Sequence, residues 1–228
     1  MAEEIIPGTL YVVPTPIGNL DDITLRAIKI LGGVDLIAAE DTRTTKFLLD
    51  HLGISKPLIS FFSHNQTVRT PQIIEKLVAG NSVALVSDAG TPGISDPAYA
   101  LITAAIENEV LIIPLPGPTA FIPALIASGL PTHEFLFAGF LPIKKGRQTE
   151  LLRLKEEKRT IVLYESPHRL LRTLEDFFEI FGDRQAVVAR ELTKKFEEIR
   201  RGSLSSQISH FSTAPIKGEF VIILAGIE

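Results

Sequence analysis

Two short runs of the sequence place carboxylates beside basic groups where an apolar segment ends. Glu40-Asp41-Thr42-Arg43 follows one such segment, and Glu165-Ser166-Pro167-His168-Arg169 follows another. Carboxylates and histidine accept protons, and arginine orients phosphates through its planar guanidinium. The candidate catalytic residues are Glu40, Arg43 and Glu165, and the candidate substrate contacts are Asp41, His168 and Arg169. For Asp41 the alternative is capping of the helix that follows it.

Three loops rich in glycine and proline also follow apolar segments. They span residues 14–20, 87–97 and 116–120. Glycine lets a ligand approach the backbone closely, and proline holds the chain rigid. Ligands of open α/β sheets bind at the carboxyl ends of the strands, so the sequence predicts ligand-binding loops here. Each loop by itself is also explained as an ordinary turn.

Basic residues cluster in one further loop. Lys144, Lys145 and Arg147 precede a charged helix with no acidic residue among them. Such a cluster suits contact with nucleic-acid phosphates, and the alternative is a solvated helix face. His64 and Asn65 follow the apolar residues 58–62 and are expected in a loop, where they are further candidates for substrate contact.

The elements that must position these groups alternate along the first half of the chain. Apolar runs rich in Val, Ile and Leu predict buried strands over residues 10–13, 34–39, 83–87 and 110–115. Helical spacing predicts helices over 23–31, 44–52, 73–77 and 98–106. This alternation indicates an α/β fold with a mainly parallel sheet. The run Pro-Leu-Pro-Gly-Pro at 114–118 cannot continue a strand, so we place a domain boundary after Gly117.

A second α/β domain is predicted over residues 118–228, after the N-terminal domain of residues 1–117. It begins with an apolar helical stretch over 119–128. Strands are expected over 135–140, 160–164, 185–191, 197–201 and 218–224, with helices near 146–158 and 168–181. The close spacing of the last strands indicates antiparallel pairs in a mixed sheet.

Composition excludes several classes of protein. The chain has 228 residues, of which 45% are hydrophobic and 22% charged, as in a globular protein. The absence of cysteine excludes disulfides, thiolate metal sites and iron–sulfur chemistry, and we expect no metal site. Signatures of P-loop, dinucleotide-binding, zinc-protease and α/β-hydrolase enzymes are absent. Neither a signal peptide nor an apolar run long enough to cross a membrane is present, so we expect a cytoplasmic protein.

Four runs together resemble a known family. They are residues 8–20, 39–43, 86–97 and 164–169. In this order they closely resemble the bacterial RsmI family of ribosomal RNA small-subunit (cytidine-2′-O)-methyltransferases, within the tetrapyrrole-methylase superfamily. The resemblance extends over essentially the whole chain. It implies a homodimer of two α/β domains with S-adenosylmethionine in the cleft between the domains, and 2′-O-methylation of a cytidine ribose in small-subunit ribosomal RNA.

The resemblance also implies which residues contact the methyl donor. Matched by motif position, they are Pro14, Asp88, Ala89, Gly90, Thr91, Ile94, Thr119, Ala120, Tyr164 and Glu219. For Tyr164 the alternative is packing within the sheet. A sulfonium methyl group is strongly electrophilic, so the protein has mainly to align the ribose oxygen and help remove its proton.

Two other functions stay open. A tetrapyrrole or other small-molecule methyltransferase would share the donor loops, and a non-catalytic RNA-binding module would keep donor affinity without turnover. The formal net charge of −4 limits RNA contact to local patches and favours an assembled ribosomal subunit over free RNA. Many family members continue for about half a domain beyond the final strand, whereas this chain ends at Glu228, so independent RNA affinity is less expected.

Overall fold

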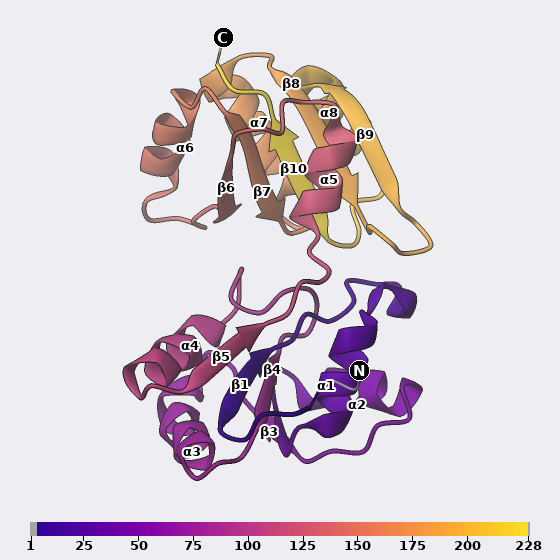
Figure 1. Ribbon diagram of the computed structural model, residues 1–228. Coiled ribbons are helices and arrows are strands. Elements are labelled where there is room, and N and C mark those ends of the chain that lie inside the picture. The colour runs from indigo at the N-terminus through magenta and orange to yellow at the C-terminus, as the bar shows by residue number, and fades with distance from the viewer. Residues whose placement is uncertain (1–3, 228) are drawn as a thin grey trace. The chain divides into compact units, whose positions relative to one another are not determined.

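The computed structural model describes residues 4–227, which form two compact units, one ending at Thr119 and the next beginning at Ala120. Each unit combines helices with a five-stranded sheet (Figure 1), which confirms the predicted α/β class. The boundary predicted after Gly117 precedes this division by two residues. No helix within the described residues is long and apolar enough to cross a membrane.

A parallel sheet forms the centre of the first unit. Its strands are β1 (Thr9–Val12), β2 (Leu36–Ala39), β3 (Leu58–Ser60), β4 (Val83–Val86) and β5 (Leu111–Pro114). Their order is β3-β2-β4-β1-β5, and every neighbouring pair is parallel, as predicted. β1 and β4 are buried along their whole length, which explains why they are continuous apolar runs. Parallel order brings the carboxyl ends of all the strands, and the loops that follow them, to one edge.

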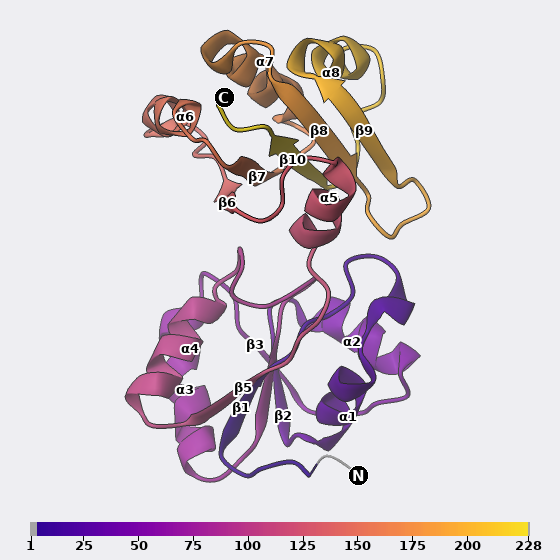
Figure 2. The same ribbon diagram turned by 45° about the horizontal axis from the view of Figure 1, so that its top comes forward.

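Helices cover both faces of this sheet. α1 (Leu25–Gly33) and α2 (Thr42–His51) pack on one face, and α3 (Gln66–Val78) and α4 (Ala98–Glu107) pack on the other (Figure 2). A short 3-10 helix, η1 (Leu20–Asp22), precedes α1. The α1 helix begins at Leu25 because Thr24 Oγ1 accepts a hydrogen bond from the Ala27 N–H at 3.0 Å. Such a cap satisfies an amide that the first turn leaves without a helical partner.

In chain order the second unit consists of α5 (Phe121–Ser128), β6 (Phe135–Phe140), α6 (Arg147–Lys155), β7 (Thr160–Glu165), α7 (Leu170–Phe181), β8 (Gln185–Arg190), β9 (Glu198–Ser203), α8 (Leu204–Phe211) and β10 (Phe220–Leu224). Its sheet is mixed, with the order β6-β7-β10-β8-β9. β6 and β7 are parallel and the other pairs are antiparallel, which confirms the predicted mixed sheet. α6, α7 and α8 pack into the core on one face, and α5 lies on the other (Figure 1).

Candidate active site

Hydrogen bonds tie together the three glycine- and proline-rich loops of the first unit. Thr15 and Gly90 form an isolated antiparallel bridge, in which each backbone N–H donates to the other residue's carbonyl oxygen at 2.9 Å. Thr91 Oγ1 donates to the carbonyl oxygen of Pro118 at 2.8 Å. The loops after β1, β4 and β5 therefore form one connected edge, which we call the donor edge.

Close packing within the donor edge requires glycine at two positions. A Cβ atom on Gly117 would lie 2.5 Å from Pro14 Cβ, which is too short for two carbons that are not bonded. Gly90 has a φ of +81°, and a Cβ atom there would lie 3.4 Å from Ile17 Cγ2. A side chain at Gly117 would force the loops apart, whereas at Gly90 the positive φ would strain any residue that has a Cβ atom. Because both backbone polar groups of Gly90 bond Thr15, this glycine shapes the loop and its N–H is not free for a ligand.

The donor edge also presents groups that fit a polar ligand. Thr119 Oγ1 is buried and has no hydrogen-bond partner among the described residues, an arrangement that costs free energy unless a ligand or water satisfies it. The exposed Asp88 carboxylate can accept hydrogen bonds from hydroxyl or ammonium groups, and the exposed Ile94 offers an apolar contact. These residues fit S-adenosylmethionine, which combines an adenosine with a charged amino-acid group.

Glu40 and Asp88 follow the neighbouring strands β2 and β4, and each carboxylate holds the other's loop. The Asp88 N–H donates to Glu40 Oε2 at 3.3 Å, and the Asp41 N–H donates to Asp88 Oδ1 at 2.9 Å. Partial burial of the carboxyl groups raises the pKa of both residues, Asp88 included although much of it is exposed, and the negative charges of Asp88 and Asp96 raise the pKa of Glu40 further, against the Asp88 hydrogen bond. A carboxylate whose pKa is raised is a stronger base, as a proton acceptor needs to be.

Asp41 is the N-cap of α2. Capping was the alternative to the predicted contact between Asp41 and the substrate. Its Oδ1 accepts a hydrogen bond from the Arg43 N–H at 2.8 Å, and its Oδ2 pairs with the Arg43 guanidinium at 2.6 Å. The hydrogen bond from the Arg43 side chain lowers the pKa of Asp41 to about 2, so Asp41 stays charged at neutral pH and is a poor proton acceptor. The Arg43 side chain is 90% exposed and accessible to a substrate phosphate.

Glu165 is the last residue of β7, and its surroundings differ from those of Glu40. Its side chain is 0% exposed, and its Oε1 pairs with Arg169 at 2.7 Å. Thr173 Oγ1 donates to Glu165 Oε2 at 2.7 Å, and the Ser166 N–H donates to Oε1 at 2.7 Å. A buried carboxylate with both oxygens engaged cannot reach a substrate, which argues against the predicted catalytic role of Glu165. The same ion pair argues against substrate contact by Arg169.

Arg147 is part of the same buried network. Its Nε donates to Asp176 Oδ2 at 2.8 Å, and its NH2 group donates to Thr173 Oγ1 at 2.8 Å. The side chain is buried, so its charge holds α6 against α7, and this argues against the predicted phosphate contact. Lys144 and Lys145, in the loop before α6, are exposed and stay candidates for that contact.

The predicted pair His64 and Asn65 lies in the turn between β3 and α3. Asn65 is the N-cap residue of α3. Its Oδ1 accepts a hydrogen bond from the Phe62 N–H at 2.8 Å, and its amide donates to the Ser60 carbonyl oxygen at 3.2 Å. Asn65 therefore shapes the turn, whereas His64 is exposed and contacts the edge of the Phe62 ring.

The remaining predicted residues belong to the second unit. Tyr164 packs in an aromatic cluster, with ring centroids 5.2 Å from Phe137 and 5.5 Å from Phe140. Glu219 pairs with Lys194 at 2.9 Å, and His168 is exposed. The donor contacts of Tyr164 and Glu219 stay predictions.

The sequence analysis did not identify the polar residues that surround Glu40, after β2, and Glu165, at the end of β7. Asp96 accepts hydrogen bonds from the N–H groups of Gly93 and Ala98, so it satisfies the first N–H of α4 and sets a negative charge near Glu40. An aspartate just before the proline that leads into a helix was the available signal. Thr173 and Asp176 lie within α7, where nothing in the local sequence reveals their buried partners.

Comparisons with known proteins agree with this fold. Residues 9–207 match the profile of the family described as Tetrapyrrole (Corrin/Porphyrin) Methylases. The chain is 51% identical to the Ribosomal RNA small subunit methyltransferase I of Halalkalibacterium halodurans, over 96% of this chain and 76% of that protein. It is 49% identical to the protein of the same name from Thermotoga maritima, over 97% of this chain and 100% of that protein.

Solved structures of lower identity share the fold. Uroporphyrin-III-C-methyltransferase from Thermus thermophilus has a TM-score of 0.68 at 20% identity, over 95% of this chain and 94% of that one. Cobalt precorrin-4 methyltransferase has a TM-score of 0.67 at 20% identity, over 96% of this chain and 95% of that one. Fold and family together define a methyltransferase whose methyl donor is S-adenosylmethionine. The chain belongs to the tetrapyrrole methylase family and, within it, to the ribosomal RNA small subunit methyltransferases I.

Proposed function

We propose that this chain transfers a methyl group from S-adenosylmethionine to the 2′-oxygen of a cytidine ribose in small-subunit ribosomal RNA. The observation that carries the proposal is the identity of 51% and 49%, over nearly the whole chain, with relatives named Ribosomal RNA small subunit methyltransferase I. The tetrapyrrole enzymes of similar fold are far more distant, at 20% identity. RNA is therefore favoured over a tetrapyrrole as the substrate.

Glu40 is the proton acceptor in this proposal. The bound donor supplies a methyl group on a positively charged sulfur, and the chain has to align the ribose oxygen with it. As the new oxygen–carbon bond forms, the sulfur–carbon bond of the donor breaks and S-adenosylhomocysteine leaves, while the proton of the 2′-hydroxyl passes to a carboxylate oxygen of Glu40. Burial, together with the negative charges of Asp88 and Asp96, keeps the pKa of Glu40 raised, which makes Glu40 a better acceptor.

Exposed basic residues position the RNA in the same proposal. Arg43 lies three residues after Glu40 and suits the phosphate beside the reacting ribose. Lys144 and Lys145 suit more distant phosphates, and the exposed His64 and His168 are retained as substrate contacts. The donor contacts assigned by resemblance, from Pro14 to Ala120, are proposed to lie along the donor edge.

We further propose that the substrate is the assembled small ribosomal subunit and that the protein acts in the cytoplasm as a homodimer. The net charge of −4 weakens general attraction to free RNA, so ribosomal proteins would add to recognition. The dimer rests on family resemblance. Sedimentation at micromolar concentration should give twice the chain mass of 25.0 kDa, and a monomer would contradict the dimer.

One experiment separates the candidate functions. Methyl transfer from labelled S-adenosylmethionine is measured in parallel on small ribosomal subunits, naked ribosomal RNA and uroporphyrinogen. We expect label on the subunits, at a nucleotide that resists alkaline cleavage because its 2′-oxygen is blocked. Label on uroporphyrinogen alone would contradict the proposal. Donor binding without transfer to any of the three would identify a non-catalytic module.

A further inference from the structure

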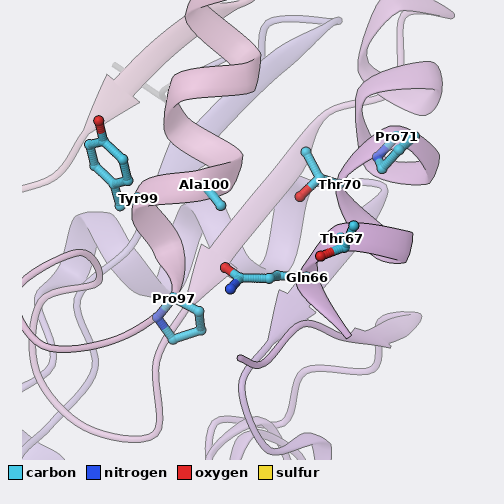
Figure 3. Close-up of a pocket in the computed structure, with 7 residues that line it drawn as sticks. All are labelled: Gln66, Thr67, Thr70, Pro71, Pro97, Tyr99 and Ala100. Atoms are coloured by element: carbon cyan, nitrogen blue, oxygen red, sulfur yellow. The ribbon is translucent and has the colours of Figure 1, made fainter. Parts of the chain in front are cut away.

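A pocket next to the donor edge lies between the first turns of α3 and α4, with Pro97 at the end of the loop after β4 in its wall. Its volume is about 540 Å³, and its walls are formed by Gln66, Thr67, Thr70, Pro71, Pro97, Tyr99 and Ala100 (Figure 3). These residues carry no charge at neutral pH. The side chain of Gln66 reaches from α3 toward α4 and Thr70 faces the same space, whereas the Tyr99 ring points away from it.

The sheet order sets this pocket beside the proposed proton acceptor. α3 follows β3 and α4 follows β4, and β2 lies between these two strands. Glu40 is the first residue after β2, so it stands between the strand ends that lead to the two walls. Asp96, next to Pro97 in one wall, is close enough for its charge to act on Glu40.

Polar groups in the α3 wall lack partners. Thr70 Oγ1 has no hydrogen-bond partner within residues 4–227. Pro71 has no N–H, so the carbonyl oxygen of Thr67, four residues earlier, loses the donor that a helix would normally provide. The Gln66 amide offers both a donor and an acceptor. Proline and alanine supply apolar surface beside these groups, so the pocket suits a flat ligand with a polar edge.

We propose that this pocket receives a nucleobase of the RNA substrate, turned out of its stack so that its ribose reaches Glu40. The inference rests on the proposed function and specifies how its substrate is held. An unstacked base exposes apolar faces and an edge of donors and acceptors, which proteins read by hydrogen bonding. A phosphate would call for lysine or arginine in the walls, and these are absent from the lining residues.

The test replaces Gln66→Leu and Thr70→Val in the full chain, which keeps side-chain size and removes hydrogen-bonding groups. We expect kcat/KM for methylation of small ribosomal subunits to fall roughly tenfold in each variant, mostly through a higher KM. Affinity for S-adenosylhomocysteine should stay unchanged. The matched control is Gln72→Leu, on the exposed surface of the same helix, which should stay within about twofold of wild type.

Photocrosslinking distinguishes failure of this inference from failure of the proposed function. Small ribosomal subunits that carry thiouridine are irradiated with the wild-type protein, and the crosslinked peptides are identified by mass spectrometry. Crosslinks at the first turns of α3 or α4 are expected. If they form without methyl transfer, the proposed function fails and the pocket assignment stands. If methyl transfer occurs but both pocket variants keep wild-type kinetics and crosslinks map elsewhere, the pocket assignment is overturned.

Discussion

The ends of β2 and β7 carry similar residues but use their carboxylates differently. Glu40 is followed by Arg43, and Glu165 is followed by Arg169. Arg169 pairs with Glu165 itself, whereas Arg43 pairs with Asp41, the residue next to Glu40. Glu40 is left with like charges around it, and Glu165 with a cation and a hydroxyl. In the proposed mechanism, the partners of these two carboxylates therefore separate proton transfer at Glu40 from stabilisation of the fold by Glu165.

The largest effect on stability should follow removal of Glu165. Glu165→Ala leaves the Arg169 and Arg147 network without its buried carboxylate, and breaking a buried pair costs about 3–5 kcal/mol. Urea unfolding should show a lower midpoint, with the Glu40→Gln variant close to wild type as the control. A decrease below about 1 kcal/mol for Glu165→Ala would remove the contrast between the two strand ends.

Donor binding should depend on the packing of the first unit's loops. Isolated wild-type protein should bind S-adenosylhomocysteine without RNA, and Gly90→Val should weaken binding by roughly a hundredfold, because its side chain would meet Ile17 and Pro118. Gly53→Val is the matched control, since Gly53 also has a positive φ but a Cβ atom there would meet nothing within 4 Å. Calorimetry on both variants checks this, and equal affinities would exclude the loop from the donor site.

The loop before α6 should affect RNA affinity alone. Replacing Lys144 and Lys145 with alanine should flatten the slope of log affinity against log salt by up to about two, one for each phosphate that a lysine no longer neutralises. Donor affinity should not change. Lys155 and Lys158, replaced together, provide the control because they are exposed beyond the cluster. An unchanged slope in the first variant would show that its lysines only contact solvent.

The smallest predicted effect is a shift in the pH dependence of kcat when a negative charge near Glu40 is removed. Asp96→Asn keeps an oxygen that can accept the hydrogen bond from the Ala98 N–H and removes a negative charge that raises the pKa of Glu40. With that charge gone the pKa of Glu40 falls, so the acid limb of the kcat profile should move to lower pH, by less than about one unit. The control is Asp50→Asn, whose carboxylate pairs with Lys46 on α2. A shift to higher pH would contradict the assignment of Glu40.

Much of the first unit was predictable because its strands are buried apolar runs separated by amphipathic helices. Three parts of this unit were not predicted, namely the 3-10 helix η1, the strand β3 and the first half of α3. β3 is short and only half-buried, and the first half of α3 contains Pro71 and few apolar residues, so its helical spacing begins only at Ile73. In the second unit α8 escaped because three of its eight residues are serine and only three are large and apolar.

The candidate site was predictable where backbone chemistry decides it. Glycine and proline marked the three loops that the structure joins into one edge, because close approach of loops needs those residue types. Contact of these loops with the methyl donor stays a prediction. Whether a carboxylate is exposed or buried in an ion pair was less predictable, because its partners come from other helices and strands. The partner of Arg147 lies 29 residues away on α7, and Glu165 is held by Thr173 across a turn of the chain. Pairing of this kind is set by packing, which local sequence does not reveal.

The most direct test of the role of Glu40 compares Glu40→Gln with Glu165→Gln. Single-turnover methyl transfer is measured at saturating S-adenosylmethionine and small ribosomal subunits, at a temperature where both variants are folded. We expect Glu40→Gln to slow the chemical step by roughly 10²–10⁴-fold, with wild-type stability, because the proton acceptor is gone. Glu165→Gln should stay within about tenfold of the wild-type rate and be less stable. A wild-type rate in Glu40→Gln, or a decrease that falls on Glu165→Gln instead, would contradict the assignment of Glu40 as the proton acceptor.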